Sequence, residues 1–143
     1  MTELPEKDSD LIRLAVADLE KCEAMPDVYK VDMGDWHLPV WNLTVDEAPR
    51  CSVCLAGAVL AQTFEVPSNV PAVPGSRIGD TEIDGNETER LLQLDMYRRG
   101  IDDSLSKLVP RKRWIVPPYY RDAPAEFKLA MLRIADELEE EGR

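Results

Sequence analysis

The chain is poor in the residues that most often carry metal or nucleophilic chemistry. Its 143 residues include three cysteines and one histidine. Because the number of cysteines is odd and no secretion signal precedes them, the composition argues against a disulfide framework and predicts reduced thiols. A structural zinc site needs four ligands. The three thiols and the imidazole could therefore supply one such site at most.

The chain also lacks a long apolar run. Its longest, residues 53–61, is about half of the roughly 20 residues that cross a bilayer. The first ten residues, MTELPEKDSD, are polar and acidic, whereas an export signal begins with basic and then apolar residues. The sequence therefore predicts a cytoplasmic protein with no membrane association, located in the host cytoplasm if a phage encodes it.

Positive charge is scarce overall but concentrated in one segment. The formal net charge is -11, which opposes binding to nucleic acid and to anionic membranes. Residues 98–121, however, contain seven basic and two acidic residues. The rest of the chain is correspondingly more acidic, and such an acidic surface could imitate nucleic acid or simply be solvated.

Helical periodicity predicts one helix near each end of the chain. The first helix is expected to be capped by Ser9 and to end at Pro26. Its apolar positions recur every three or four residues, at Ile12, Ala15, Leu19 and Cys22. Three polar residues fall outside this face and are expected to be exposed, namely Asp18, Glu20 and Lys21. The last helix starts at residues 122–124 and has an apolar face at Phe127, Met131, Ile134 and Leu138.

The central part of the chain predicts a small β-hairpin and a buried helix. Residues 28–36 alternate in polarity, which predicts a strand, and residues 37–50 mix Pro39 and Pro49 with apolar residues, which allows a second short strand. A β-hairpin is therefore expected at about residues 28–45. Residues 51–64 contain no helix breaker except Gly57 and are apolar all round, so they are expected to form a central helix in the core. A further helical pattern covers residues 87–109. We expect one α+β domain over residues 1–143, mainly α-helical, with about four helices around the central one.

Two segments resist assignment to regular structure. Residues 66–86 form a long loop rich in proline and glycine, and loops of this length are commonly functional or disordered. Residues 110–123 are extended, because paired prolines exclude helical geometry. This second segment is also basic and aromatic.

The motif CSVC, residues 51–54, admits two readings based on a metal or on redox chemistry. Two thiolates at this spacing can hold a metal ion, and Cys22 and His37 would have to complete the site with Cys51 and Cys54. Alternatively, Cys51 at a helix N-terminus would have a lowered thiol pKa, and Cys54 would resolve a mixed disulfide. Neither reading has all the surrounding features that its protein class normally shows.

The same residues admit a hydrolytic reading and a purely structural one. Cys51 or Cys54 would be the nucleophile, His37 the base, and Asp32 or Asp35 the residue that orients the base. In the structural reading, Cys54 packs in the core and Cys51 lies near the start of the helix, because free cysteines behave as small hydrophobic residues. Packing is the preferred interpretation, and it requires no cofactor.

The same stretch of sequence resembles that of a known group of proteins. The residues VDMGDWH followed by CSVCLAGAVLA resemble a signature of small uncharacterised bacteriophage and prophage proteins, in which a Met-x-x-Trp-His element precedes Cys-x-Val-Cys-Leu-Ala-Gly-Ala. The resemblance covers about residues 8–66. It implies a phage origin, and it assigns no catalytic residue.

The segment RKRWIVPPYYR, residues 111–121, has two interpretations. It is a connector whose aromatic residues cover the core while its charges pair with the acidic remainder of the chain, or it is the strongest candidate for a binding surface. Arginine, tryptophan and tyrosine dominate binding energy at protein interfaces, and cations between aromatics also suit single-stranded nucleic acid. The candidate binding residues are Arg111, Arg113, Trp114, Tyr119, Tyr120 and Arg121. A protein partner is preferred to nucleic acid, and a homodimer is compatible with the sequence.

These observations favour a non-catalytic function. The expected protein is a small acidic phage or prophage accessory protein that binds a host or phage macromolecule, for example to inhibit a host protein. The alternative is a thiol- or metal-dependent enzyme or redox protein centred on Cys51, Cys54 and His37.

Overall fold

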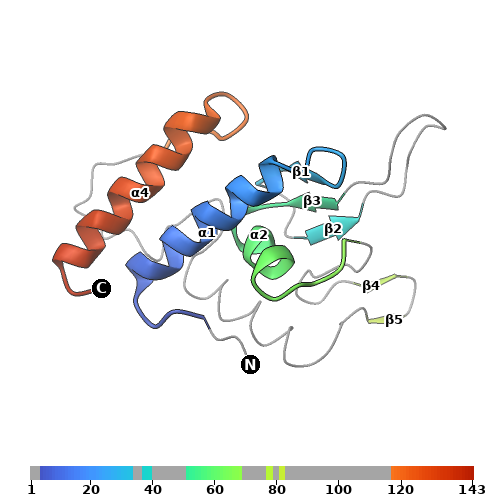
Figure 1. Cartoon of the computed structure of the whole chain (residues 1–143), viewed down its shortest axis with the longest axis horizontal. Helices are drawn as coiled ribbons and strands as arrows, with labels where there is room; N and C mark the ends of the chain where they lie inside the picture. The colour runs from blue at the N-terminus through green and yellow to red at the C-terminus, as the bar shows by residue number, and fades with distance from the viewer. Residues whose placement is uncertain (1–3, 34–36, 40–50, 69–76, 79–80, 83–116) are drawn as a thin grey trace.

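The computed structural model describes residues 4–33, 37–39, 51–68, 77–78, 81–82 and 117–143 (Figure 1). Its helices are α1 (Asp8–Glu23), α2 (Leu55–Gln62) and α4 (Pro124–Glu140). Its strands are β1 (Tyr29–Val31), β2 (His37–Pro39), β3 (Cys51–Val53), β4 (Arg77–Ile78) and β5 (Thr81–Glu82). The described part is therefore mainly helical with small sheets, as the α+β prediction requires.

Helix α1 lies between α4 and α2 and contacts both (Figure 1). Its predicted apolar positions are buried, so the periodicity identified the correct face. The predicted cap is wrong, because Lys7 is the N-cap residue and caps with no side-chain hydrogen bond. Ser9 is instead buried inside the first turn, and its hydroxyl donates a hydrogen bond to the carbonyl oxygen of Arg143, at 3.1 Å.

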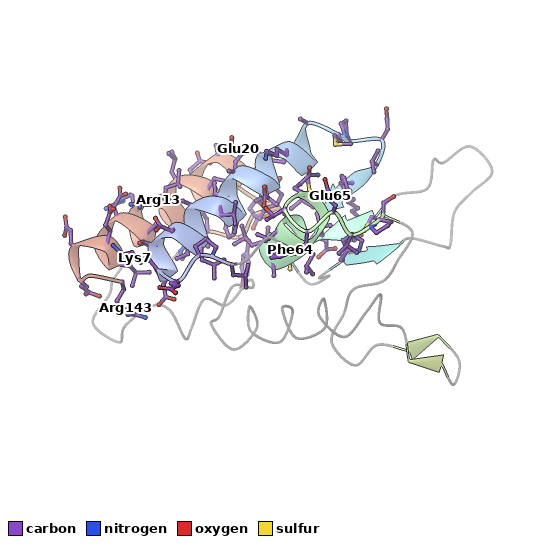
Figure 2. The ribbon with its side chains drawn as sticks, turned by 60° about the horizontal axis from the view of Figure 1, so that its bottom comes forward. Lys7, Arg13, Glu20, Phe64, Glu65 and Arg143 are labelled. Carbon is purple, nitrogen blue, oxygen red and sulfur yellow. The ribbon has the colours of Figure 1, made fainter. Side chains whose placement is uncertain are left out.

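Helix α4 runs antiparallel to α1. It begins at Pro124, which needs no hydrogen-bond acceptor for its nitrogen at this position, and its predicted apolar face is buried. Arg13 of α1 donates to Asp136 at 2.9 Å and to Glu139 at 2.8 Å. Figure 2 shows Arg13 and Arg143 near the end of this helix pair where α1 starts. The two termini of the described chain are thus held together.

The small sheet corrects the predicted hairpin. Strand β3 lies in the middle, parallel to β1 and antiparallel to β2. The strands β1 and β2 within residues 28–45 therefore do not pair with each other. All three residues of β3 are buried, and a central position gives this strand hydrogen-bonding partners on both edges.

The predicted helix over residues 51–64 is also corrected. Its first three residues form β3, Cys54 is extended with φ -94° and ψ -169°, and the helix covers Leu55–Gln62. From Leu55 to Ala61 every residue of α2 is buried. The prediction of a central buried helix is confirmed for this shorter range.

The remaining expectations are met in part. The described residues contain three helices and not about four, and the helical pattern at residues 87–109 lies outside them. Within the segment 66–86, which was expected to lack regular structure, β4 and β5 form a short antiparallel pair. No helix in the described ranges is both long enough and apolar enough to cross a membrane.

Candidate functional site

The sheet brings Cys51 and His37 into contact. His37 pairs with Val53 across β2 and β3, and Cys51 lies two residues before Val53, so all three side chains share one face of the sheet. The Cys51 Sγ atom lies 3.5 Å from His37 Nδ1, and both residues are fully buried. The contact is between two groups that the hydrolytic reading requires.

The geometry of the contact between Cys51 and His37 is compatible with a neutral thiol and a neutral imidazole. The Cys51 Sγ atom is also 3.8 Å from the carbonyl oxygen of Ser52, so the imidazole can donate to sulfur while the thiol donates to this carbonyl. Burial disfavours charged forms unless they are paired. In this state the contact joins β2 to β3.

Cys54 lies apart from Cys51, although the motif places them close in sequence. Three steps along an extended chain span about 10 Å, and successive side chains point to opposite faces. A disulfide requires Cα atoms within about 7 Å. The extended backbone from Cys51 to Cys54 therefore prevents the pair from forming a redox disulfide or from chelating one metal ion in this conformation.

Cys54 is the N-cap residue of α2. Its Sγ atom accepts a hydrogen bond from the backbone N–H of Gly57, at 3.4 Å. Cys54 is also buried, 1% exposed in the hydrophobic core, so the prediction that it packs there is confirmed. The prediction for Cys51 is wrong, because Cys51 begins strand β3 and the helix starts only at Leu55. Cys51 lies in the core strand, and Cys54 caps the helix.

This geometry predicts how Cys54 tolerates substitution. Serine is a preferred N-cap residue, because its oxygen accepts the same backbone hydrogen bond. We expect Cys54→Ser to change the free energy of unfolding little and Cys54→Ala to lower it by about 1 kcal/mol. Urea unfolding of both variants measures the difference. Equal losses would contradict the capping role.

Cys22 occupies a third environment. Its side chain is buried on α1, and Gln62 Nε2 donates a hydrogen bond to its Sγ atom, at 3.5 Å. Burial, against the opposing effect of the Gln62 hydrogen bond, raises the pKa of the Cys22 thiol to about 11. A thiol with such a pKa is a poor nucleophile and metal ligand. Among the described residues, no group of three or more His, Cys, Asp or Glu side chains could hold a metal.

A buried carboxyl group was missed by the sequence analysis. Asp18 was expected to be exposed, but its side chain is 1% exposed between α1 and the end of α2. Thr63 donates a hydrogen bond to its Oδ2 atom at 2.5 Å, and the Lys21 ammonium lies 3.6 Å from its Oδ1 atom. Burial raises the pKa of Asp18, although Thr63 and Lys21 act in the opposite direction.

The raised pKa has a consequence for stability. The folded state binds the Asp18 proton more tightly than the unfolded state does. This contribution is complete below the unfolded-state pKa, and it is lost as the pH rises through the raised folded-state pKa. We expect Asp18→Asn to raise the free energy of unfolding at pH 7, with a smaller gain near pH 4. Urea unfolding at both pH values tests this, and a gain that grows on acidification would contradict it.

The two adjacent tyrosines of the basic-aromatic segment have different environments. Tyr119 is 74% exposed, and the Arg121 guanidinium carbon lies 5.6 Å from the centre of its ring. Tyr120 is half-buried and meets Phe127 edge to face, with ring centres 5.6 Å apart. The Tyr120 hydroxyl donates a hydrogen bond to Glu23. Burial, reinforced by this bond and by the Glu23 charge, raises the pKa of Tyr120.

Glu23 therefore anchors the segment to α1. One of its carboxylate oxygens accepts from Tyr120, and the other lies 2.6 Å from the Lys128 ammonium. Sequence spacing could not reveal this network, because its members lie on opposite ends of the chain. The other binding candidates, Arg111, Arg113 and Trp114, lie outside the described residues, as does Asp35.

Comparisons with protein-family models, with curated proteins and with solved structures found no match to this chain.

Proposed function

We propose that this chain is a non-catalytic accessory protein of the phage or prophage type, which acts by binding a protein partner through a surface that includes Tyr119 and Arg121. The observation that carries the proposal is the exposure of Tyr119, 74% of its surface, beside a neighbour that is anchored in the fold. Tyrosine and arginine are enriched at the energetic centres of interfaces.

The anchor reduces the entropic cost of binding. Tyr120 is held by Phe127 and Glu23, and Pro117 and Pro118 restrict the preceding backbone. A preorganised segment loses less conformational freedom when a partner binds. Tyr119 and Arg121 are thus presented on a constrained backbone.

The charge favours a protein over nucleic acid. The net charge is -11, and Asp122 lies 3.7 Å from the exposed guanidinium of Arg121. A nucleic-acid site would need several cations to contact phosphates, and its affinity would fall steeply with salt. An interface with an aromatic centre is less sensitive to salt.

The test uses a double variant at the exposed pair. Wild-type protein and the variant Tyr119→Ala/Arg121→Ala are used to capture partners from host lysate, and an identified partner is then titrated calorimetrically. We expect the variant to bind more weakly by about 2 kcal/mol or more. The matched control is Lys30→Ala, an exposed residue on β1. A partner that binds both variants as tightly as wild type would contradict the proposed surface.

The contact between Cys51 and His37 favours thiol catalysis as a second candidate. In an acyl transfer, His37 Nδ1 would take the thiol proton, and the thiolate would attack the carbonyl carbon of an ester or amide. The C–O or C–N bond would break, and the leaving alcohol or amine would depart with the proton from His37. Water would then hydrolyse the thioester, which releases the carboxylic acid and restores the thiol. The 3.5 Å distance suits this proton transfer, whereas the complete burial of both groups opposes access by a substrate.

Alkylation separates the two candidates. If the pair is catalytic, iodoacetamide should modify Cys51 in the folded protein at pH 6, and His37→Gln should slow the reaction. If the contact is structural, Cys51 should react only after unfolding, at the same rate in both proteins. Mass spectrometry of the digested protein identifies the modified cysteine.

A further inference from the structure

One face of helix α4 is left uncovered by the rest of the described fold. Its apolar face packs toward α1, the one described element that α4 contacts. The opposite side, here called the outer face of α4, consists of exposed residues at helical spacing. These are Ala125, Glu126, Leu129, Arg133, Asp136 and Glu140.

The outer face combines an apolar centre with two charges that lack partners in the described residues. Leu129 is 61% exposed. Glu126 lies on one side of it along the helix and Arg133 on the other, and neither forms an ion pair within the described ranges. The two charges are seven positions apart, about 10.5 Å along the helix axis, so they cannot pair with each other.

This arrangement is complementary to itself in one orientation. If a second copy of α4 lies antiparallel, with the two-fold axis between residues 129 and 130, residue 126 faces residue 133 of the other copy. Each Glu126 then meets an Arg133, which gives two equivalent ion pairs. A parallel copy in register would place like charges together. Antiparallel packing also aligns opposite helix dipoles.

The centre of the same arrangement allows close approach. In this register Leu129 lies opposite Ala130, a partly buried residue at the edge of the outer face, and the small alanine side chain leaves room for the leucine. Asp136 does not disturb the charge pattern, because Arg13 of α1 already lies 2.9 Å from it. The face therefore has an apolar middle flanked by complementary charges, the order usual at interfaces.

We propose that the outer face of α4 binds a second copy of this chain in an antiparallel, two-fold symmetric dimer. The contact surface is isologous, as in most homodimers. A single helix face is smaller than the roughly 800 Å² per partner of a standard interface. The dimer is therefore reversible, with a Kd on the order of 100 µM.

Charge exchange tests the proposal. Sedimentation equilibrium of the full chain, at concentrations around the expected Kd, should show dimerisation of the wild type. Glu126→Arg and Arg133→Glu should each weaken it roughly tenfold, because each places like charges opposite one another. The double variant E126R/R133E should recover dimerisation, and the two single variants mixed together should form heterodimers.

The control is Glu20→Arg, which makes the same charge change at an exposed position on α1. It should leave dimerisation as in the wild type, and far-UV circular dichroism checks that every variant is folded. A wild type that stays monomeric across the concentration range would overturn the proposal. So would a folded double variant that fails to recover dimerisation. Neither outcome bears on the surface at Tyr119, which is tested by different residues.

Discussion

Replacement of Gly57 by leucine should lower the free energy of unfolding more than any of the substitutions described above. Gly57 lies in the first turn of α2, where every residue from Leu55 to Ala61 is buried. Leucine adds four carbon atoms at a position enclosed on a helix that has no exposed side. We expect a loss of about 3 kcal/mol, the upper end of the usual cost of overpacking, and a fall in Tm of roughly 10 °C.

The control is Gly57→Ala. One methyl group adds little volume, and alanine favours the helix over glycine by about 0.5–1 kcal/mol. Alanine should therefore cost much less than leucine, and thermal unfolding followed by circular dichroism compares the two. If both variants melt with the wild type, α2 is not the packed centre of the core.

Tyr120→Ala should produce the second large loss. It removes the ring that meets Phe127 and the hydroxyl that donates to Glu23. Truncation of a buried aromatic residue to alanine costs about 3–5 kcal/mol. Because Tyr120 is half-buried, we expect about 2–3 kcal/mol, measured by urea unfolding.

Two variants divide this loss into its parts. Tyr120→Phe removes the hydroxyl alone and should cost about 1 kcal/mol, the net value of one hydrogen bond. Tyr119→Ala changes the exposed neighbour and should leave the free energy of unfolding nearly unchanged. If Tyr119→Ala were as destabilising as Tyr120→Ala, the anchored and exposed roles would not be distinct.

The helices at the two ends of the chain were predictable because their burial follows one simple period. Ile12 and Leu19 of α1, and Phe127 and Ile134 of α4, lie on the predicted buried faces. Asp18 broke the pattern. Its hydrogen-bond partner Thr63, the C-cap residue of α2, is 45 residues away in sequence, so no local signal marks this carboxyl group as buried.

The strand at Cys51–Val53 shows why the middle of the chain was less predictable. A short apolar run fits a buried strand as well as a buried helix, and here the absence of breakers favoured the helix. One strand on each side of β3, namely β1 and β2, gives its backbone hydrogen-bonding partners. That pairing links residues distant in sequence, and a scan of local propensity does not include it.

The candidate site was likewise predictable from the sequence only in part. Residue type alone identified Cys51, Cys54 and His37 as candidates for chemistry, and Tyr119 with Arg121 as candidates for binding. Whether such residues meet depends on strand register and helix packing. Strand register brings Cys51 to His37, and the extended backbone separates Cys51 from Cys54. Packing turns Tyr120 inward and leaves Tyr119 exposed. Local periodicity and composition thus determined the amphipathic helices and the acidic character of the protein. Tertiary contacts decided the sheet order, the burial of Asp18 and the contact of Cys51 with His37, because each depends on partners that the chain brings together only when it folds.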